Sequence, residues 1–246
     1  MKDPRPPLLY LRSFLYELPN NFSRLDLKTE EQMVASVLRD LGPVVAVGQP
    51  GETLPPFSGM LMVQFDGSVW KEEVLKLMLK AQLIVINPGL GENLKWEIST
   101  ARRGCAPEKL IVPLRTLQSL DPRTRKREWT QFRKVLESSL GVSMPDDIRT
   151  AAFLHFEADW SPRFVGENNW AHKMYGGRVI NVFLGDGSVV IIRETLRRIL
   201  KKRGLRLNRL GVLKDIGSAA LDNLAWWLVM LMAAWGFFRP AALNVS

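Results

Sequence analysis

Short, fully apolar runs alternate along the first half of the chain with longer segments in which apolar residues recur every three or four positions. The apolar runs cover residues 8–11, 44–47, 83–86 and 110–114, and a further short strand is expected at 59–65. Strands that are apolar on both sides are typical of a parallel sheet covered by helices on both faces. The pattern therefore predicts an α/β fold with this architecture.

Four segments have the spacing of amphipathic helices. The first begins at Thr29-Glu-Glu-Gln32, a capping-box pattern, and its inward-facing positions are Met33, Val34, Val37, Leu38 and Leu41. The second, near residues 70–81, would turn Trp70, Val74, Leu77, Met78 and Ala81 inward. The third is expected at about 94–103, and the fourth, at 123–140, would bury Trp129, Phe132, Val135 and Leu136.

The second half of the chain is less regular. A strand is expected at 151–159, and residues 185–188 (Gly-Asp-Gly-Ser) predict a hairpin turn between strands at 179–184 and 189–192. The chain then divides into an α/β domain (1–140), an extension with a β-hairpin and a basic helix (141–215), and an apolar C-terminal helix (216–246).

Composition excludes several classes of protein. The 246 residues are 46% hydrophobic and 24% charged, which excludes a disordered or collagen-like chain. One cysteine, Cys105, cannot form an intramolecular disulfide, and with two histidines a zinc site would lack ligands. The N-terminus lacks the apolar region of a secretory signal, so we expect a cytoplasmic protein. We expect no bound metal.

The net charge of +9 is concentrated near the C-terminus. Residues 193–214 contain nine basic side chains and one acid, Glu194, and a charge-free apolar stretch follows at 224–238. A basic cluster beside an apolar stretch favours an anionic membrane surface. Fifteen residues are short for a spanning helix, so a core helix docked on the main domain is the alternative. We expect residues 216–246 to anchor the chain to the inner face of the cell membrane.

A ligand crevice is expected where the parallel strands end, because open α/β sheets bind ligands outside their carboxyl edge. The residues that follow the strands there are Arg12, Ser13 and Phe14, then Gly48 and Gly51, then Asn87, Gly89 and Gly91. These glycines match neither a dinucleotide-binding G-x-G-x-x-G pattern nor a P-loop.

Glu97 is the candidate catalytic residue. It follows the glycine-bearing loop, and we expect it in the first turn of a helix, where the helix dipole favours an ionised carboxylate. An ionised carboxylate can attack or stabilise a sugar carbon that becomes cation-like when a glycosidic bond breaks. Trp96 would supply a stacking surface, and Glu92 is expected in the preceding loop. The alternative is that Glu97 merely complements the helix dipole.

The order of these elements and the motif Trp96-Glu97-Ile98-x-x-Ala101 resemble two related groups over about residues 8–114. These are the Toll/interleukin-1 receptor (TIR) and TIR-like domains and the nucleoside 2-deoxyribosyltransferases. The resemblance implies a flavodoxin-like sheet. It also implies that Glu97 acts at a ribose carbon, as the nucleophile in a transferase or beside a tryptophan in an NAD-cleaving TIR domain. Residues 8–14, 42–56 and 77–86 also look like bacterial TIR-like proteins, some of them membrane-associated.

The resemblance leads to three hypotheses. The first is an NAD⁺ nucleosidase of bacterial defence or signalling, in which Arg12 and the first two loops bind phosphates and NAD⁺ is substrate, not a retained cofactor. The second is a non-enzymatic, self-associating interaction module at the membrane, and the third is a nucleoside deoxyribosyltransferase. No nucleic-acid partner is expected, since the basic cluster lacks interleaved aromatic residues.

Overall fold

The computed structural model describes residues 3–11, 29–48, 60–148, 150–166, 188–208 and 211. Its centre is a seven-stranded sheet in the order β3-β2-β1-β4-β5-β6-β7. The strands are β1 (Leu8–Leu11), β2 (Val44–Gly48), β3 (Leu61–Gln64), β4 (Leu83–Ile86), β5 (Leu110–Pro113), β6 (Ala151–Phe156) and β7 (Pro162–Gly166). The helices are α1 (Glu30–Leu38), α2 (Trp70–Lys80), α3 (Glu92–Gly104), α4 (Arg115–Ser119), α5 (Pro122–Leu140) and α8 (Ser188–Lys201), with a 3₁₀ turn η1 (Pro107–Lys109).

Strands β1 to β5 are parallel, and β6 and β7 continue the sheet antiparallel. This confirms the α/β class and the mostly parallel sheet. The five strands expected in the first half form as predicted, each within a few residues of its expected bounds. Residues beyond 140 add two strands to the same sheet, so part of the expected extension shares its core.

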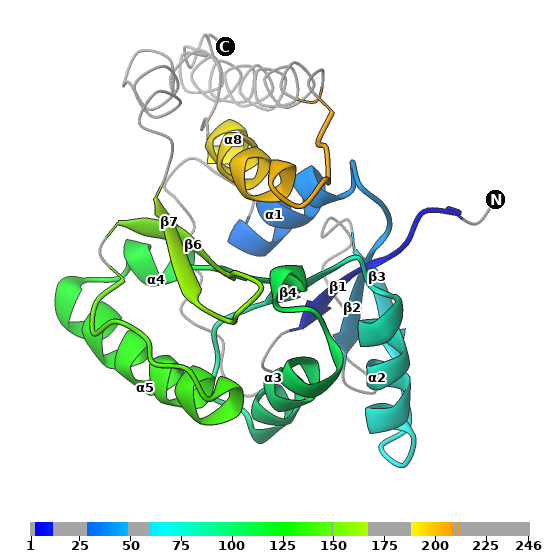
Figure 1. Ribbon diagram of the computed structural model, residues 1–246, viewed down its shortest axis with the longest axis horizontal. Coiled ribbons are helices and arrows are strands. Elements are labelled where there is room, and N and C mark those ends of the chain that lie inside the picture. The colour runs from blue at the N-terminus through cyan, green and yellow to red at the C-terminus, as the bar shows by residue number, and fades with distance from the viewer. Residues whose placement is uncertain are drawn as a thin grey trace, which may run out of the picture.

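Helices cover both faces of the sheet (Figure 1). α1 and α8 pack together on one face, and α2, α3 and α5 lie on the other. Each face has its own buried apolar cluster, because alternate residues of the central strands point to opposite sides. Leu9 and Ile84 belong to the cluster under α2, α3 and α5, whereas Leu8 and Val85 belong to the cluster under α1 and α8.

The helix ends follow from local sequence. At α1 the expected capping box forms: Thr29 Oγ1 accepts from the Gln32 amide at 3.3 Å, and Gln32 Oε1 accepts from the Thr29 amide at 2.9 Å. Asp121 caps α5 by accepting from two backbone amides, and Gly141, in the left-handed conformation (φ 68°), ends it. The inward-facing residues predicted for α5 include Trp129, Phe132 and Leu136, which are buried.

The prediction of a hairpin around residues 185–188 is wrong for its second strand. Residues 189–192 begin α8 instead of forming a strand. The β-branched run favours a strand locally, but Ile192, Leu196, Ile199 and Leu200 recur at helical spacing and are buried against the sheet. The expected strand at 179–184 lies outside the described residues.

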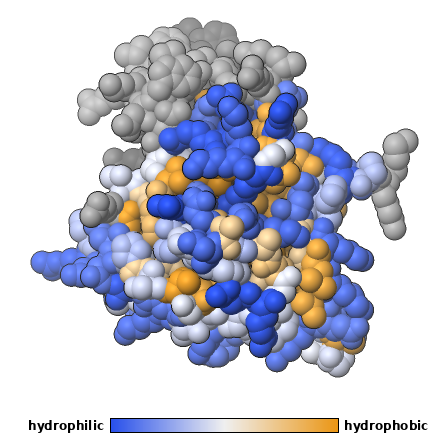
Figure 2. Space-filling view, viewed as in Figure 1, coloured by the Kyte–Doolittle hydropathy of each residue, from blue (hydrophilic) through white to orange (hydrophobic). Residues whose placement is uncertain are grey.

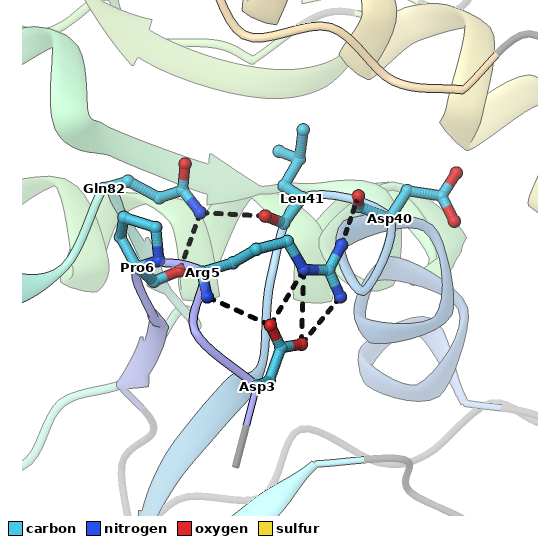
Figure 3. Close-up of polar contacts among 6 residues, drawn as sticks. All are labelled: Asp3, Arg5, Pro6, Asp40, Leu41 and Gln82. Carbon is cyan, nitrogen blue, oxygen red and sulfur yellow. Dashed lines mark hydrogen bonds and ion pairs between the residues drawn. The ribbon is translucent and has the colours of Figure 1, made fainter. Parts of the chain in front are cut away.

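Side chains tie the amino edge of the sheet together (Figure 3). Gln82, just before β4, donates from Nε2 to the carbonyl of Pro6 at 2.7 Å and to that of Leu41 at 3.1 Å. Arg5 donates to the carbonyl of Asp40 at 2.7 Å. These contacts connect the segments that precede β1, β2 and β4, which leaves the opposite, carboxyl edge for the loops expected to bind ligand.

The basic segment does not form one uniform solvated face. Arg193 is buried and pairs with Asp40, which joins α8 to the end of α1. Arg198 donates to the carbonyl of Gly166 at 2.9 Å. Within the described ranges, no helix has the length and apolar character needed to cross a membrane. The expected anchor at 216–246 falls outside these ranges.

Candidate functional site

The described site residues gather at the carboxyl edge of the parallel strands. Gly48 ends β2, Asn87 follows β4, Gly89 lies in the next loop, Gly91 precedes α3, and Trp96 and Glu97 lie within α3. Arg12, Ser13, Phe14 and Gly51 lie outside the described residues. Of the expected ligand loops, the structure therefore describes the one between β4 and α3.

Asn87 connects three elements at this edge. Its backbone amide donates to the carbonyl of Leu11 at 2.8 Å, and its side-chain amide donates to Glu31 Oε1 at 2.7 Å. The end of β4 is thereby fixed to the end of β1 and to the first turn of α1. Sequence reasoning missed Glu31, because its partner lies 56 residues away.

Glu30 makes a second connection that the sequence did not predict. Its carboxylate accepts from the amides of Arg115 (3.0 Å) and Thr116 (2.6 Å) and from the Thr116 hydroxyl (2.5 Å). Burial raises the pKa of Glu30, against the opposing effect of the Thr116 hydrogen bonds and the Arg115 charge. The two acids after Thr29 thus hold the residue that follows β4 and the first turn of α4, a role beyond favouring the start of a helix.

Glu97 lies deeper in α3 than expected. The helix begins at Glu92, so Glu97 is in the second turn, and Glu92 is helical and exposed instead of lying in a loop. Gly91 occupies the N-cap position without a side-chain cap, so the usual sequence signal for a helix start is missing. The Glu97 side chain is only 1% exposed.

The surroundings of Glu97 favour its neutral form. Its Oε2 atom has no hydrogen-bond partner among the described residues, and burial raises its pKa to about 8. The expectation that the helix N-terminus keeps this carboxylate ionised is therefore wrong. The dipole effect fades within the first turn, whereas desolvation acts fully on a buried acid beside Leu94, Ile98 and Ala101 of the core.

Helix geometry turns Glu97 toward α2. Residue 104 lies on the same face of α3, two turns later, and a Cβ placed on Gly104 would lie 3.8 Å from Leu79 of α2. Near the start of α2, the Trp70 ring lies 5.0 Å from that of Trp96, tilted by 47°, and the Lys71 ammonium lies 5.5 Å from the centre of a Trp96 ring. The expected stacking surface of Trp96 thus already has two neighbours.

Trp70 is a site residue that sequence reasoning missed. It was predicted to be one of the inward-facing residues of its helix, and it is half-buried against the core. Its position as the first residue of α2 also brings it to the carboxyl edge, beside Trp96. The sequence feature that could have indicated this role is a tryptophan at the start of the helix that connects β3 to β4.

Other candidate chemistry lies elsewhere. In the described part of the chain, no three histidine, cysteine or acidic side chains come together as a metal-binding group. Cys105 is half-buried, and burial raises the pKa of its thiol. A basic hollow of about 480 Å³ lies on α5, lined by Arg123, Lys126, Arg127, Thr130, Gln131 and Lys134. Because one helix supplies all six residues, we interpret it as the space between long surface side chains.

Comparison with protein-family models, with curated proteins and with solved structures finds no match for this chain. The geometry of the site is therefore the basis for any functional argument. It consists of a buried glutamate with a raised pKa, directly after one tryptophan of an indole pair, at the carboxyl edge of a parallel α/β sheet.

Proposed function

We propose that this chain is a TIR-like enzyme that hydrolyses the bond between nicotinamide and ribose in NAD⁺, with Glu97 as the catalytic residue. The order β2-β1-β4-β5 agrees with a flavodoxin-like sheet to which β3 adds an edge strand. The motif Trp96-Glu97-Ile98-x-x-Ala101 follows the third of these strands along the chain, as the resemblance to TIR-like domains requires.

The burial of Glu97 carries the proposal. Oε2 of Glu97 has no hydrogen-bond partner among the described residues. Burial of such a polar atom in an apolar setting lowers the stability of the fold, a cost that a leucine at this position would avoid. Ionisable groups with strongly shifted pKa values gather at functional sites. The position of Glu97 beside a glycine-bearing loop at the carboxyl edge is where such sheets bind ligands.

The raised pKa of Glu97 suits a cationic substrate. The nicotinamide ring of NAD⁺ is positively charged, so its binding beside Glu97 would lower the pKa of Glu97 and drive its proton to solvent. The resulting carboxylate stabilises the positive charge that develops at the ribose carbon as the glycosidic bond breaks. Nicotinamide leaves with the bonding electron pair and becomes neutral.

Water then completes the reaction. Its oxygen bonds to the ribose carbon, and the Glu97 carboxylate takes the released proton. One NAD⁺ and one water thus yield ADP-ribose, nicotinamide and a proton. The indole pair of Trp70 and Trp96 limits access of bulk water to Glu97, and Arg12 with the first two loops would hold the phosphates.

One observation favours a non-enzymatic interaction module instead. Apolar side chains lie exposed over α2 in the space-filling view (Figure 2), where Leu75 is 36% and Leu79 is 54% exposed. The edge strand β3 also exposes Leu61 at 60%. Apolar residues beside an open strand edge are typical of surfaces that associate.

The membrane association and the role in bacterial defence or signalling are part of the same proposal. They rest on the basic residues of 193–214 other than the buried Arg193, on the apolar residues of 216–246 and on the TIR-like resemblance. Fractionation of cells that express the full chain and a chain ending at residue 215 tests the first part. Full-length protein found wholly in the soluble fraction contradicts it.

Substrate competition tests the reaction. Full-length protein is incubated at high concentration, which permits self-association, with NAD⁺ or with a deoxynucleoside and a second free base. Nicotinamide release with no base exchange supports the nucleosidase. Base exchange with no nicotinamide release indicates the nucleoside deoxyribosyltransferase, and inertness toward both substrates favours the interaction module.

A further inference from the structure

The outer face of α2 carries apolar side chains where a surface helix is ordinarily polar. Val74 and Met78 supply the buried side of this helix. Leu75 and Leu79 lie one turn apart outside that buried side, and both are exposed. Single exposed leucines are normal on a protein surface, but two of them one turn apart on a helix form a continuous apolar strip. This strip adds little to the packing of the described core.

α2 stands at the margin of the described fold. α3 contacts both α5 and α2, so α2 is the outermost helix of this layer among the described elements (Figure 1). β3 is the edge strand of the sheet as described. Leu61 of β3 is exposed and points to the α2 face of the sheet, because Val63 and Phe65, two and four residues later, pack on that side. The apolar strip thus lies at a margin where a second molecule can approach.

The charges of α2 change sign from one end to the other. Its first turn holds Glu72 and Glu73, and its last turn holds Lys80. Lys76, in the middle, forms ion pairs with both acids of its own helix, each at 2.8 Å. Lys80 is exposed and has no carboxylate partner within the described ranges. Lys71, the remaining base, is turned toward α3. A helix with acids at its start and a free base at its end is complementary to an antiparallel copy of itself.

We propose that two copies of this chain associate through α2, with the two helices antiparallel about a twofold axis. Leu75 and Leu79 are centred on residue 77, and Glu72 and Lys80 are centred on residue 76. One axis at this point therefore places Leu75 of each copy near Leu79 of the other, and Glu72 of each copy near Lys80 of the other. Apolar contacts at the centre and charged pairs at the rim are the usual plan of a protein interface.

A second copy fits this face better than a wholly acidic or wholly basic partner. Either of those would meet charges of its own sign at one end of α2, whereas an antiparallel copy meets the opposite sign at both ends. The same arrangement places the positive end of each helix dipole beside the negative end of the other. The contact names a partner for the exposed face that favours the interaction module, and it does not depend on the reaction proposed for Glu97.

Sedimentation velocity of the full-length protein over a range of concentrations measures this association without any substrate. We expect a reversible monomer–dimer equilibrium in the wild type, and dimerisation at least about tenfold weaker in Leu79→Glu. Gln131→Glu, which adds the same charge on the exposed side of α5, is the matched control and should dimerise as the wild type does. Because the apolar residues 224–238 can also cause association, the variants and not the mass alone decide the result.

Charge reversal tests the antiparallel geometry. Glu72→Lys brings bases together and Lys80→Glu brings acids together, so each variant alone should weaken the dimer by about fivefold, since each pair occurs twice. The double variant restores opposite charges and should recover most of the affinity, while circular dichroism checks that every variant is folded. A wild type that stays monomeric, a dimer indifferent to Leu79→Glu, or a double variant no tighter than the single ones overturns the proposal.

Discussion

The indole rings of Trp70 and Trp96 lie 5.0 Å apart and join the first residue of α2 to the second turn of α3. Glu97 follows Trp96 directly, and the face of α3 that carries it turns toward α2. The aromatic pair therefore joins α3 to the helix toward which Glu97 turns, and we expect it to limit the access of water to the carboxyl. On this expectation, the packing of the two helices influences the protonation state of the candidate catalytic residue.

Removal of one indole should hydrate Glu97. Trp70→Ala deletes the ring contact and leaves space at the start of α2, so the pKa of Glu97 should fall from about 8 toward the ordinary glutamate range. Stability should fall by about 2 kcal/mol. Carboxyl-carbon NMR of glutamate-labelled protein measures the titration, and Leu75→Ala, on the exposed side of α2, is the control. An unchanged titration in Trp70→Ala would show that the pair does not cover Glu97.

Burial of Glu97 should make stability depend on pH. Because its pKa is raised in the folded state, the folded protein binds more protons than the unfolded chain between about pH 4.5 and 8. Wild-type stability should therefore decline across this range as pH rises. Glu97→Gln removes this titration. The free energy of unfolding of the variant should therefore exceed that of the wild type by an amount that grows with pH, toward about 5 kcal/mol at pH 8 and above.

Urea unfolding at pH 5.5 and pH 8.5 measures this difference. Glu92→Gln, on the same helix, is the control, because Glu92 is exposed and should give nearly the same stability change at both pH values. A free-energy difference between wild type and Glu97→Gln that does not change with pH contradicts the buried, neutral glutamate.

The strands and most helices could be predicted from the sequence because local patterns determine them. Runs such as residues 83–86 are apolar on both sides, and the capping box at Thr29 fixes the start of α1. The carboxyl-edge position of Asn87 and Glu97 followed from the order of these elements alone. The depth of Glu97 did not, since α3 starts without a capping side chain.

Other features depend on contacts between distant segments. The bond between Asn87 and Glu31 spans 56 residues, and no local pattern indicates it. At residues 189–192, β-branched side chains favour a strand, yet packing against the sheet and α1 makes the segment helical. The burial of Arg193 could not be predicted from the sequence either, because the composition of its segment indicates a solvated basic face.

The buried pair of Arg193 and Asp40 should be important for packing α8 on α1. Arg193→Met leaves Asp40, which is 19% exposed, without its partner, and we expect a loss of about 3–5 kcal/mol. Arg163→Met, which breaks the exposed pair with Glu157, should cost less than about 1 kcal/mol. Chemical denaturation measures both variants. Equal losses would contradict a structural role specific to Arg193.

Gln82 should stabilise the amino edge of the sheet. Gln82→Met keeps the side-chain length but leaves the carbonyls of Pro6 and Leu41 without their shared donor. We expect a loss of about 1–3 kcal/mol, measured by urea unfolding. Gln131→Met, on the exposed side of α5, is the comparison, and a loss of similar size there would show that the two hydrogen bonds of Gln82 contribute little.

The most direct test of the account is nicotinamide release from NAD⁺ by the wild type, Glu97→Gln and Glu92→Gln, each at high concentration. Chromatography of the products follows the reaction, and circular dichroism checks that each variant is folded. We predict release by the wild type and Glu92→Gln and at least about a 100-fold slower reaction by Glu97→Gln. Release by folded Glu97→Gln at the wild-type rate, or no release by the wild type, would contradict the assignment of Glu97 as the catalytic residue of an NAD⁺ nucleosidase.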